Sequence, residues 1–146
     1  MDKVYSIEER IVLIVEEFFE DIHRKEPFAQ HLEDYRFRLR SKLIELLAQQ
    51  TDSRGFDSAI NGIMACIERQ INRIDLENEK ELRRVLETLE KTNELLKEFL
   101  EGDRIKDKTV LSKVSGRLGT LTEELRMEIN RRFGGLLKKL KRLFTF

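Results

Sequence analysis

The sequence FDSAINGIMACIERQINRI, residues Phe56–Ile74, carries four charged side chains in a chain of 146 residues of which 38% are Asp, Glu, Lys or Arg. Its large apolar residues recur at spacings of three and four, the period of one helix face; they are Ile60, Ile63, Met64, Ile67, Ile71 and Ile74. Small residues such as Gly62 and Ala65 widen the apolar surface. Because a helix that is apolar on most sides is usually enclosed by other helices, we predict that this helix is the centre of the protein.

The segments on either side show the same period and carry residues typical of helix boundaries. Ser6 and Glu9 match a capping box, Pro27 suits the first turn of a helix, and Gly102 is typical of a helix end. We predict an all-α fold, an antiparallel bundle of about five helices that forms one domain over residues 1–146. The predicted helices span residues 7–25, 27–50, 57–74, 77–101 and 109–144, and Asp57 or Ser58 is expected to cap the third.

The formal net charge is zero, but the charges are unevenly distributed. Residues 131–146 contain no acid and six basic side chains, so the first 130 residues hold 28 − 6 = 22 bases against 28 acids, a net charge of −6. The basic residues are Arg131, Arg132, Lys138, Lys139, Lys141 and Arg142. Gly134 and Gly135 predict a hinge, which makes residues 134–146 a basic amphipathic C-terminal segment.

Four roles are open to this C-terminal segment. Its leucines can close the core of the bundle while the lysines reach the rim, or the segment can dock a protein partner. It can also contact nucleic acid through the phosphate backbone, or lie on an anionic membrane surface. The sequence does not choose among them.

Cys66 is the only cysteine in the chain. A single thiol on an apolar helix face indicates a reducing compartment and a structural role as a small core residue. The N-terminal residues do not match a signal peptide, and no apolar run approaches the roughly 18–20 residues of a membrane span. We therefore expect a cytoplasmic protein.

Catalytic and metal-binding motifs are incomplete. Glu20 and His23 form a Glu-x-x-His step, but a di-iron site in a helical bundle needs a second such step, and the other histidine, His31, has Phe28 three residues before it. No glycine-rich phosphate loop is present. We predict that the acidic residues near Glu20 form the wet face of the first helix, that the protein holds no metal or cofactor, and that it is not an enzyme; no small-molecule substrate is inferred.

Basic and aromatic residues alternate in the second predicted helix. Arg36, Arg38 and Arg40 are separated by steps of two, about 200° around a helix, so they cannot form one basic stripe. Tyr35 and Phe37 are expected to be aromatics at the edge of the core, with stacking on nucleic-acid bases as the alternative.

The helix predicted at 77–101 has a heptad-like pattern in which Leu89, Asn93, Leu96 and Leu100 follow one another at spacings of four, three and four. Asn93 occupies an a-type position, where a buried asparagine sets register and oligomer state. This stripe is either ordinary bundle core or the interface with another copy or another protein. We predict a non-enzymatic interaction or assembly protein that forms homo-oligomers or binds a protein partner; the alternative is a nucleic-acid-associated protein that uses the basic C-terminus.

Overall fold

Five α-helices account for most of residues 4–49 and 54–134, the part of the chain that the computed structural model describes. They are α1 (Ile7–Glu20), α2 (Phe28–Gln49), α3 (Arg54–Ile71), α4 (Glu79–Glu101) and α5 (Thr109–Ile129). A short 3₁₀-helix, η1 (Ile22–Arg24), follows α1, and a π-helix, η2 (Asn130–Gly134), follows α5. The described residues contain no β-strand, so the predicted all-α class is confirmed.

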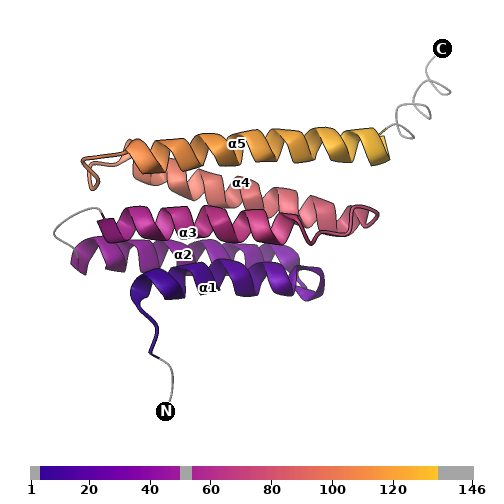
Figure 1. The fold of residues 1–146 in the computed structure, drawn as a ribbon. Helices are drawn as coiled ribbons and strands as arrows, with labels where there is room; N and C mark the ends of the chain where they lie inside the picture. Colours follow the sequence, from indigo (N-terminus) through magenta and orange to yellow (C-terminus); the bar gives the residue numbers. More distant parts are fainter. Residues whose placement is uncertain (1–3, 50–53, 135–146) are drawn as a thin grey trace.

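The helices form two layers that run in alternating directions along the chain. In Figure 1, α1, α3 and α5 lie side by side at the front, and α2 and α4 lie behind them. The packing agrees with this view, because α3 contacts α1, α2 and α5, and α4 contacts α2 and α5. Consecutive helices are antiparallel, as predicted for a bundle with short connections.

The core is built around α3, as its apolar pattern predicts. Ile60, Ile63 and Ile67 are fully buried, and so is Phe56 in the first turn, whose ring lies 5.8 Å from that of Phe99 in α4. Large apolar side chains from all five helices belong to the same cluster. The central position of this helix is therefore confirmed.

Local capping determines where α1 and α4 begin. The Glu9 amide donates to the Ser6 hydroxyl at 3.1 Å, which confirms the predicted capping of α1. The Glu81 amide donates in the same way to the side-chain oxygen of Asn78 at 3.0 Å, so α4 starts two residues later than predicted. Gly102 follows the last residue of α4, as predicted.

The boundaries of α3 differ from the prediction. The helix begins at Arg54, so the expectation that Asp57 or Ser58 caps it was wrong; both lie inside the helix. It ends at Ile71 instead of residue 74, because the amide of Ile74 donates to the carbonyl of Ile71 in a tighter turn. At the C-terminus, the predicted helix 109–144 is α-helical to residue 129 and π-helical to residue 134, and residues 135–144 lie outside the described part.

The first helix is shorter than predicted, and Arg84 of α4 holds the turn that follows it. Its guanidinium donates to the carbonyl oxygens of Ile22 at 2.8 Å and Lys25 at 3.2 Å, and the residue is only 7% exposed. It also bonds to the carboxylate of Glu26 and lies 4.7 Å from the ring centre of Phe28. The amide of Arg24 donates to the carbonyl of Asp21 at 2.9 Å in the tighter turn of η1, so the α-helix ends at Glu20, and Arg84 pairs with carbonyl groups that this turn leaves free.

A chain of hydroxyl groups runs through the contact between α2 and α4. Thr92 donates to the carbonyl of Thr88 at 2.7 Å, and Thr88 donates to the carbonyl of Arg84 at 2.7 Å. Since the single proton of Thr92 is used there, the hydroxyl of Tyr35, 2.7 Å away, must be the donor in the bond between them. Burial raises the pKa of Tyr35, so this donor keeps its proton.

Gly62 allows the closest approach between α1 and α3. A Cβ atom at this position would lie 2.7 Å from Cγ2 of Val12 in α1, well inside van der Waals contact. Gly116 and Gly119 lie inside α5, and glycines within a helix predict that another backbone passes close to them. A Cβ at Gly116 would meet no atom of the described residues within 4 Å, and one at Gly119 would be in ordinary contact with Asn93, so that expectation was wrong for this chain.

We expect Gly62→Ala to destabilise the protein even though alanine favours helix. Overpacking a core costs about 1–3 kcal/mol, which outweighs the roughly 1 kcal/mol that alanine gains over glycine within a helix. Chemical denaturation should therefore show a net loss of up to about 2 kcal/mol in the free energy of unfolding.

Gly116→Ala is the matched control, because the same helix propensity is gained at an open position. We expect it to raise the free energy of unfolding by about 0.5–1 kcal/mol. Equal stabilisation by both substitutions would contradict the close approach of α1 and α3 at Gly62.

Candidate functional site

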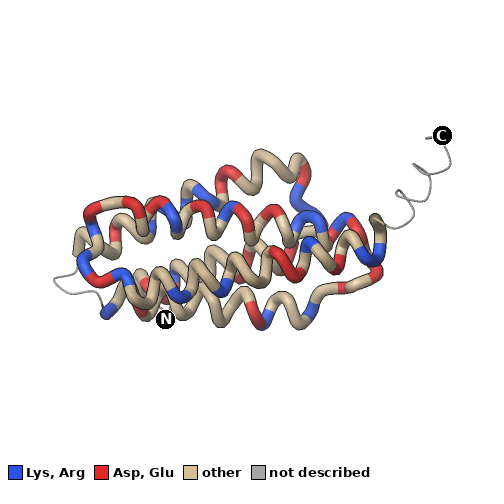
Figure 2. Tube along the Cα trace, turned by 90° about the horizontal axis from the view of Figure 1, so that it is seen from above, with Lys and Arg blue, Asp and Glu red and all other residues tan. Residues whose placement is uncertain are grey.

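Charged side chains cover the bundle, and many are paired between helices. Figure 2 shows Lys and Arg alternating with Asp and Glu along most of the helices. Arg36 and Arg40 of α2 both bond to Glu98 of α4, at 3.1 and 2.8 Å, and Arg126 of α5 bonds to Glu90 of α4 at 2.7 Å. These basic groups form ion pairs between helices. The charged side chains available to a binding partner are therefore those without such an ion pair.

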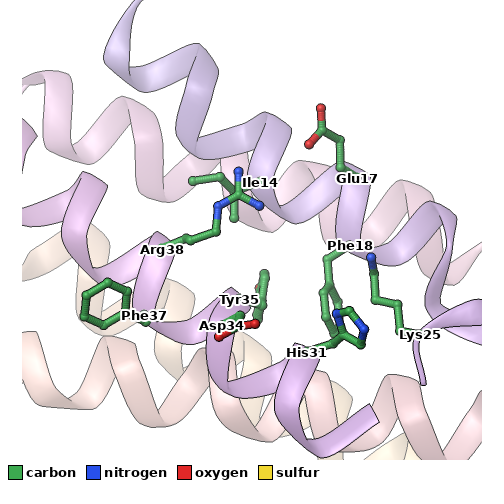
Figure 3. A pocket seen from close by; sticks show the side chains of 9 residues that line it. All are labelled: Ile14, Glu17, Phe18, Lys25, His31, Asp34, Tyr35, Phe37 and Arg38. Atoms are coloured by element: carbon green, nitrogen blue, oxygen red, sulfur yellow. The ribbon is translucent and has the colours of Figure 1, made fainter. Parts of the chain in front are cut away.

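A groove between α1 and α2, with a volume of about 360 Å³, is lined by charged side chains that form no ion pair with the described part of the chain. We call it the α1–α2 groove. Figure 3 shows its lining side chains, with Lys25 and His31 at one end, Arg38 reaching toward Ile14 of α1 at the other, and Phe37 at the outer edge. The lining residues are Ile14, Glu17, Phe18, Lys25, His31, Asp34, Tyr35, Phe37 and Arg38.

Two stacked aromatic rings form the floor of the groove. The rings of Phe18 and Tyr35 lie 4.5 Å apart at an angle of 28°, and the ammonium of Lys25 lies 5.2 Å from the centre of the Phe18 ring. The hydroxyl of Tyr35 is held by Thr92 on the far side, which fixes the ring in place. The floor is therefore rigid and apolar.

The rim of the groove carries both signs of charge. Glu17, Asp34 and Arg38 are exposed, and Lys25 and His31 are partly exposed. None of the five forms an ion pair with another residue in the part of the chain that the structure describes, although Asp34 and Arg38 are four positions apart on one helix face. These groups are free to contact a binding partner.

Phe37 stands beside this rim and is 70% exposed. The prediction that Tyr35 and Phe37 both lie at the edge of the core was wrong for Phe37. Two residues apart on a helix point about 200° from each other, so only Tyr35 faces the core, where it is 3% exposed. A phenyl ring left in water beside unpaired charges is a feature typical of contact sites.

The residues predicted as an oligomer interface face the interior of this chain. Leu89 and Leu96 are fully buried, Leu100 is partly buried against the core, and the side-chain oxygen of Asn93 accepts a bond from the Ser115 hydroxyl of α5 at 2.7 Å. The seam is thus occupied by α5 and the rest of the bundle. Contact with another copy at these residues would require α4 and α5 to separate, and the oligomer stays a prediction.

Two of the six C-terminal basic residues are held by acids. Arg131 and Arg132 bond to Glu128, and Arg132 also bonds to Glu77 in the connection between α3 and α4 at 3.1 Å. Hydrogen bonds from Arg131 and then Arg132 lower the pKa of Glu128 to about 2. The other four, Lys138, Lys139, Lys141 and Arg142, lie outside the described residues, as does Gly135 of the predicted hinge.

Within residues 4–49 and 54–134, no group of three or more His, Cys, Asp or Glu side chains is placed to hold a metal ion. Glu17, Glu20 and Asp21 are exposed on α1 and just after it, as predicted for its wet face. Cys66 is fully buried, and this burial raises the pKa of its thiol. None of the described helices has the length and apolar character needed to cross a membrane.

Comparison with protein-family models, curated proteins and solved structures finds no match to this chain.

The ion pairs of Glu128 lead to a prediction about pH. Because the pKa of this carboxylate in the folded protein lies below its ordinary value of 4.5, at about 2, its stabilising effect is complete above about pH 4.5. The effect is lost as the pH falls through about 2, when the folded form is protonated.

We expect a carboxyl NMR titration of Glu128 with a midpoint near 2 in the wild type. The midpoint should move toward 4.5 in the Arg131→Ala, Arg132→Ala double variant. A wild-type midpoint near the ordinary value would show that these ion pairs do not persist in solution.

Proposed function

We propose that this protein is a non-enzymatic interaction protein, an adaptor or small subunit that docks another protein onto the α1–α2 groove. The observation that carries the proposal is the 70% exposure of Phe37 beside a groove whose charged side chains have no ion-pair partners among the described residues. Aromatic and arginine side chains are enriched in protein interfaces and supply much of their binding energy. A cytoplasmic location is part of the same proposal and rests on the single unpaired cysteine.

The mixed charge of the rim favours a polypeptide as the partner. Lys25, His31 and Arg38 stand opposite or beside the carboxylates of Glu17 and Asp34. A protein segment with an apolar side chain between residues of opposite charge can satisfy both signs. A phosphate backbone would meet repulsion from the two carboxylates and would use only the cations.

The nucleic-acid alternative gains no support from the described residues. Arg36, Arg40, Arg126, Arg131 and Arg132 are all engaged with carboxylates. The alternative therefore depends on the four basic residues beyond residue 134 and on described basic residues without an ion pair, such as Lys25 and Arg38, and the experiment below includes it as an outcome.

A photo-crosslinking residue placed at position 37 tests the proposal in cells. Position 127 is the matched control, because Met127 is 69% exposed on α5, far from the groove in the sequence and on a different helix. We expect a specific protein to be captured at position 37 and not at position 127. Capture of nucleic acid, or equal capture at both positions, would contradict the proposal.

The captured protein, once purified, should bind the wild type and Met127→Ser equally. We expect Phe37→Ser to weaken binding by about tenfold or more, the effect of losing a hot-spot aromatic. Binding should change little between about 50 and 200 mM salt, whereas contacts to six or more phosphates would lose about 10³–10⁵-fold in affinity over that range.

A further inference from the structure

A second cavity lies at the end of the bundle and shares no residue with the α1–α2 groove. Its volume is about 430 Å³. Two stretches of chain meet there. One is the end of α1 with η1, and the other runs from the end of α3 through the connection to the first turns of α4. We call it the end cavity. Its size is in the range of small-molecule sites, which are typically about 300–1,000 Å³.

Gln70 is the feature of the end cavity that points to a ligand. It lines the cavity and is only 9% exposed, yet its side-chain amide forms no hydrogen bond with any residue that the structure describes. Its backbone carbonyl accepts from the Arg73 amide at 3.0 Å, which holds the residue in the last turn of α3. The two amide atoms are not fully enclosed, so they stay accessible at the cavity and are free to bond to a molecule there.

The charges around the end cavity determine which net charge is favoured in that molecule. Three carboxylates line it, Glu20, Asp75 and Glu81, against one guanidinium, Arg73, so with a neutral histidine the net charge of the lining is 1 − 3 = −2. Asp75 is engaged with the amide of Glu77, but the carboxylates of Glu20 and Glu81 form no ion pair or hydrogen bond among the described residues. Two acids are therefore left for a cation.

Helix dipoles act in the same direction. The cavity lies at the C-terminal ends of α1 and α3, the negative ends of their dipoles, which favour positive charge. The positive end of α4 is also near, but the side chain of Asn78 caps it by accepting from the Glu81 amide at 3.0 Å. The balance at the cavity thus favours a cation.

Apolar side chains form the rest of the wall. Phe19, Ile22 and Val85 are each less than one-tenth exposed and line the cavity beside the acids. We propose that the end cavity binds a small organic amine, whose ammonium group bonds to Glu20, Glu81 and Gln70 while a short apolar body packs against these walls. An ammonium group has three donors, which match these three acceptors.

Three small molecules of nearly equal size test this proposal on the full chain. Phenethylamine carries the ammonium group, phenethyl alcohol is neutral, and phenylacetate is an anion. We expect phenethylamine to shift the NMR signals of the Gln70 side-chain amide and of residues around the cavity. The alcohol should bind about tenfold or more weakly, because it lacks the charge-assisted bonds, and phenylacetate should not bind.

Variants on one helix provide the control. We expect Glu81→Gln to weaken phenethylamine binding about tenfold or more. Glu87→Gln removes an equal charge from an exposed position of α4 outside both cavities, and should leave the affinity unchanged. Circular dichroism confirms that both variants are folded.

Two results would overturn the proposal. One is equal binding of phenethylamine, phenethyl alcohol and phenylacetate, because the cavity would then not distinguish ligands by their charge. The other is the absence of any shift around Gln70 when phenethylamine is added in millimolar excess. Neither result affects the proposal for the α1–α2 groove, which is tested by other residues.

Discussion

The enclosure of α3 is the constraint on which the rest of this structure depends. Ile60, Ile63 and Ile67 form one buried face of this helix, and the buried Ala59 and Cys66 widen it, so α1, α2 and α5 all pack against it. The contact with α1 is close enough that a side chain at Gly62 would collide with Val12. A two-layer arrangement follows, since helices on several sides of α3 leave α4 to cover α2 and α5 (Figure 1).

Polar groups then fix the place of α4 in the bundle. The Tyr35–Thr92 bond and the Asn93–Ser115 bond join α4 to α2 and to α5 from inside the core, where an unpaired hydroxyl or amide would be costly. Ion pairs such as those of Glu98 add contacts at the surface, each worth little alone. Some of the charges that these networks leave unpaired lie around the α1–α2 groove and the end cavity, and the two functional proposals rest on them.

Helical periodicity predicts most of the fold, because one apolar face is enough to identify each helix and the α3 pattern identifies the centre. It does not distinguish a seam filled by the same chain from one filled by another copy, so Leu89, Asn93 and Leu96 could be assigned to either. The exposure of Phe37 follows from its two-residue separation from Tyr35, and periodicity could have shown it. Arg84 could not be found in this way, because its burial depends on carbonyl groups about 60 positions earlier in the chain. The same holds for Gln70, whose cavity is formed by two stretches far apart in the sequence, residues 19–23 and 70–85.

Native-state hydrogen exchange tests the central place of α3 most directly. If the other helices pack around this helix, the amides of Ile60–Ile67 can exchange only when the whole protein unfolds. Their opening free energy should then equal the global free energy of unfolding from denaturant titration, while amides near the end of α5 open at lower free energy. Exchange of the Ile60–Ile67 amides at a free energy clearly below the global value, with α1 or α4 better protected, would contradict the account.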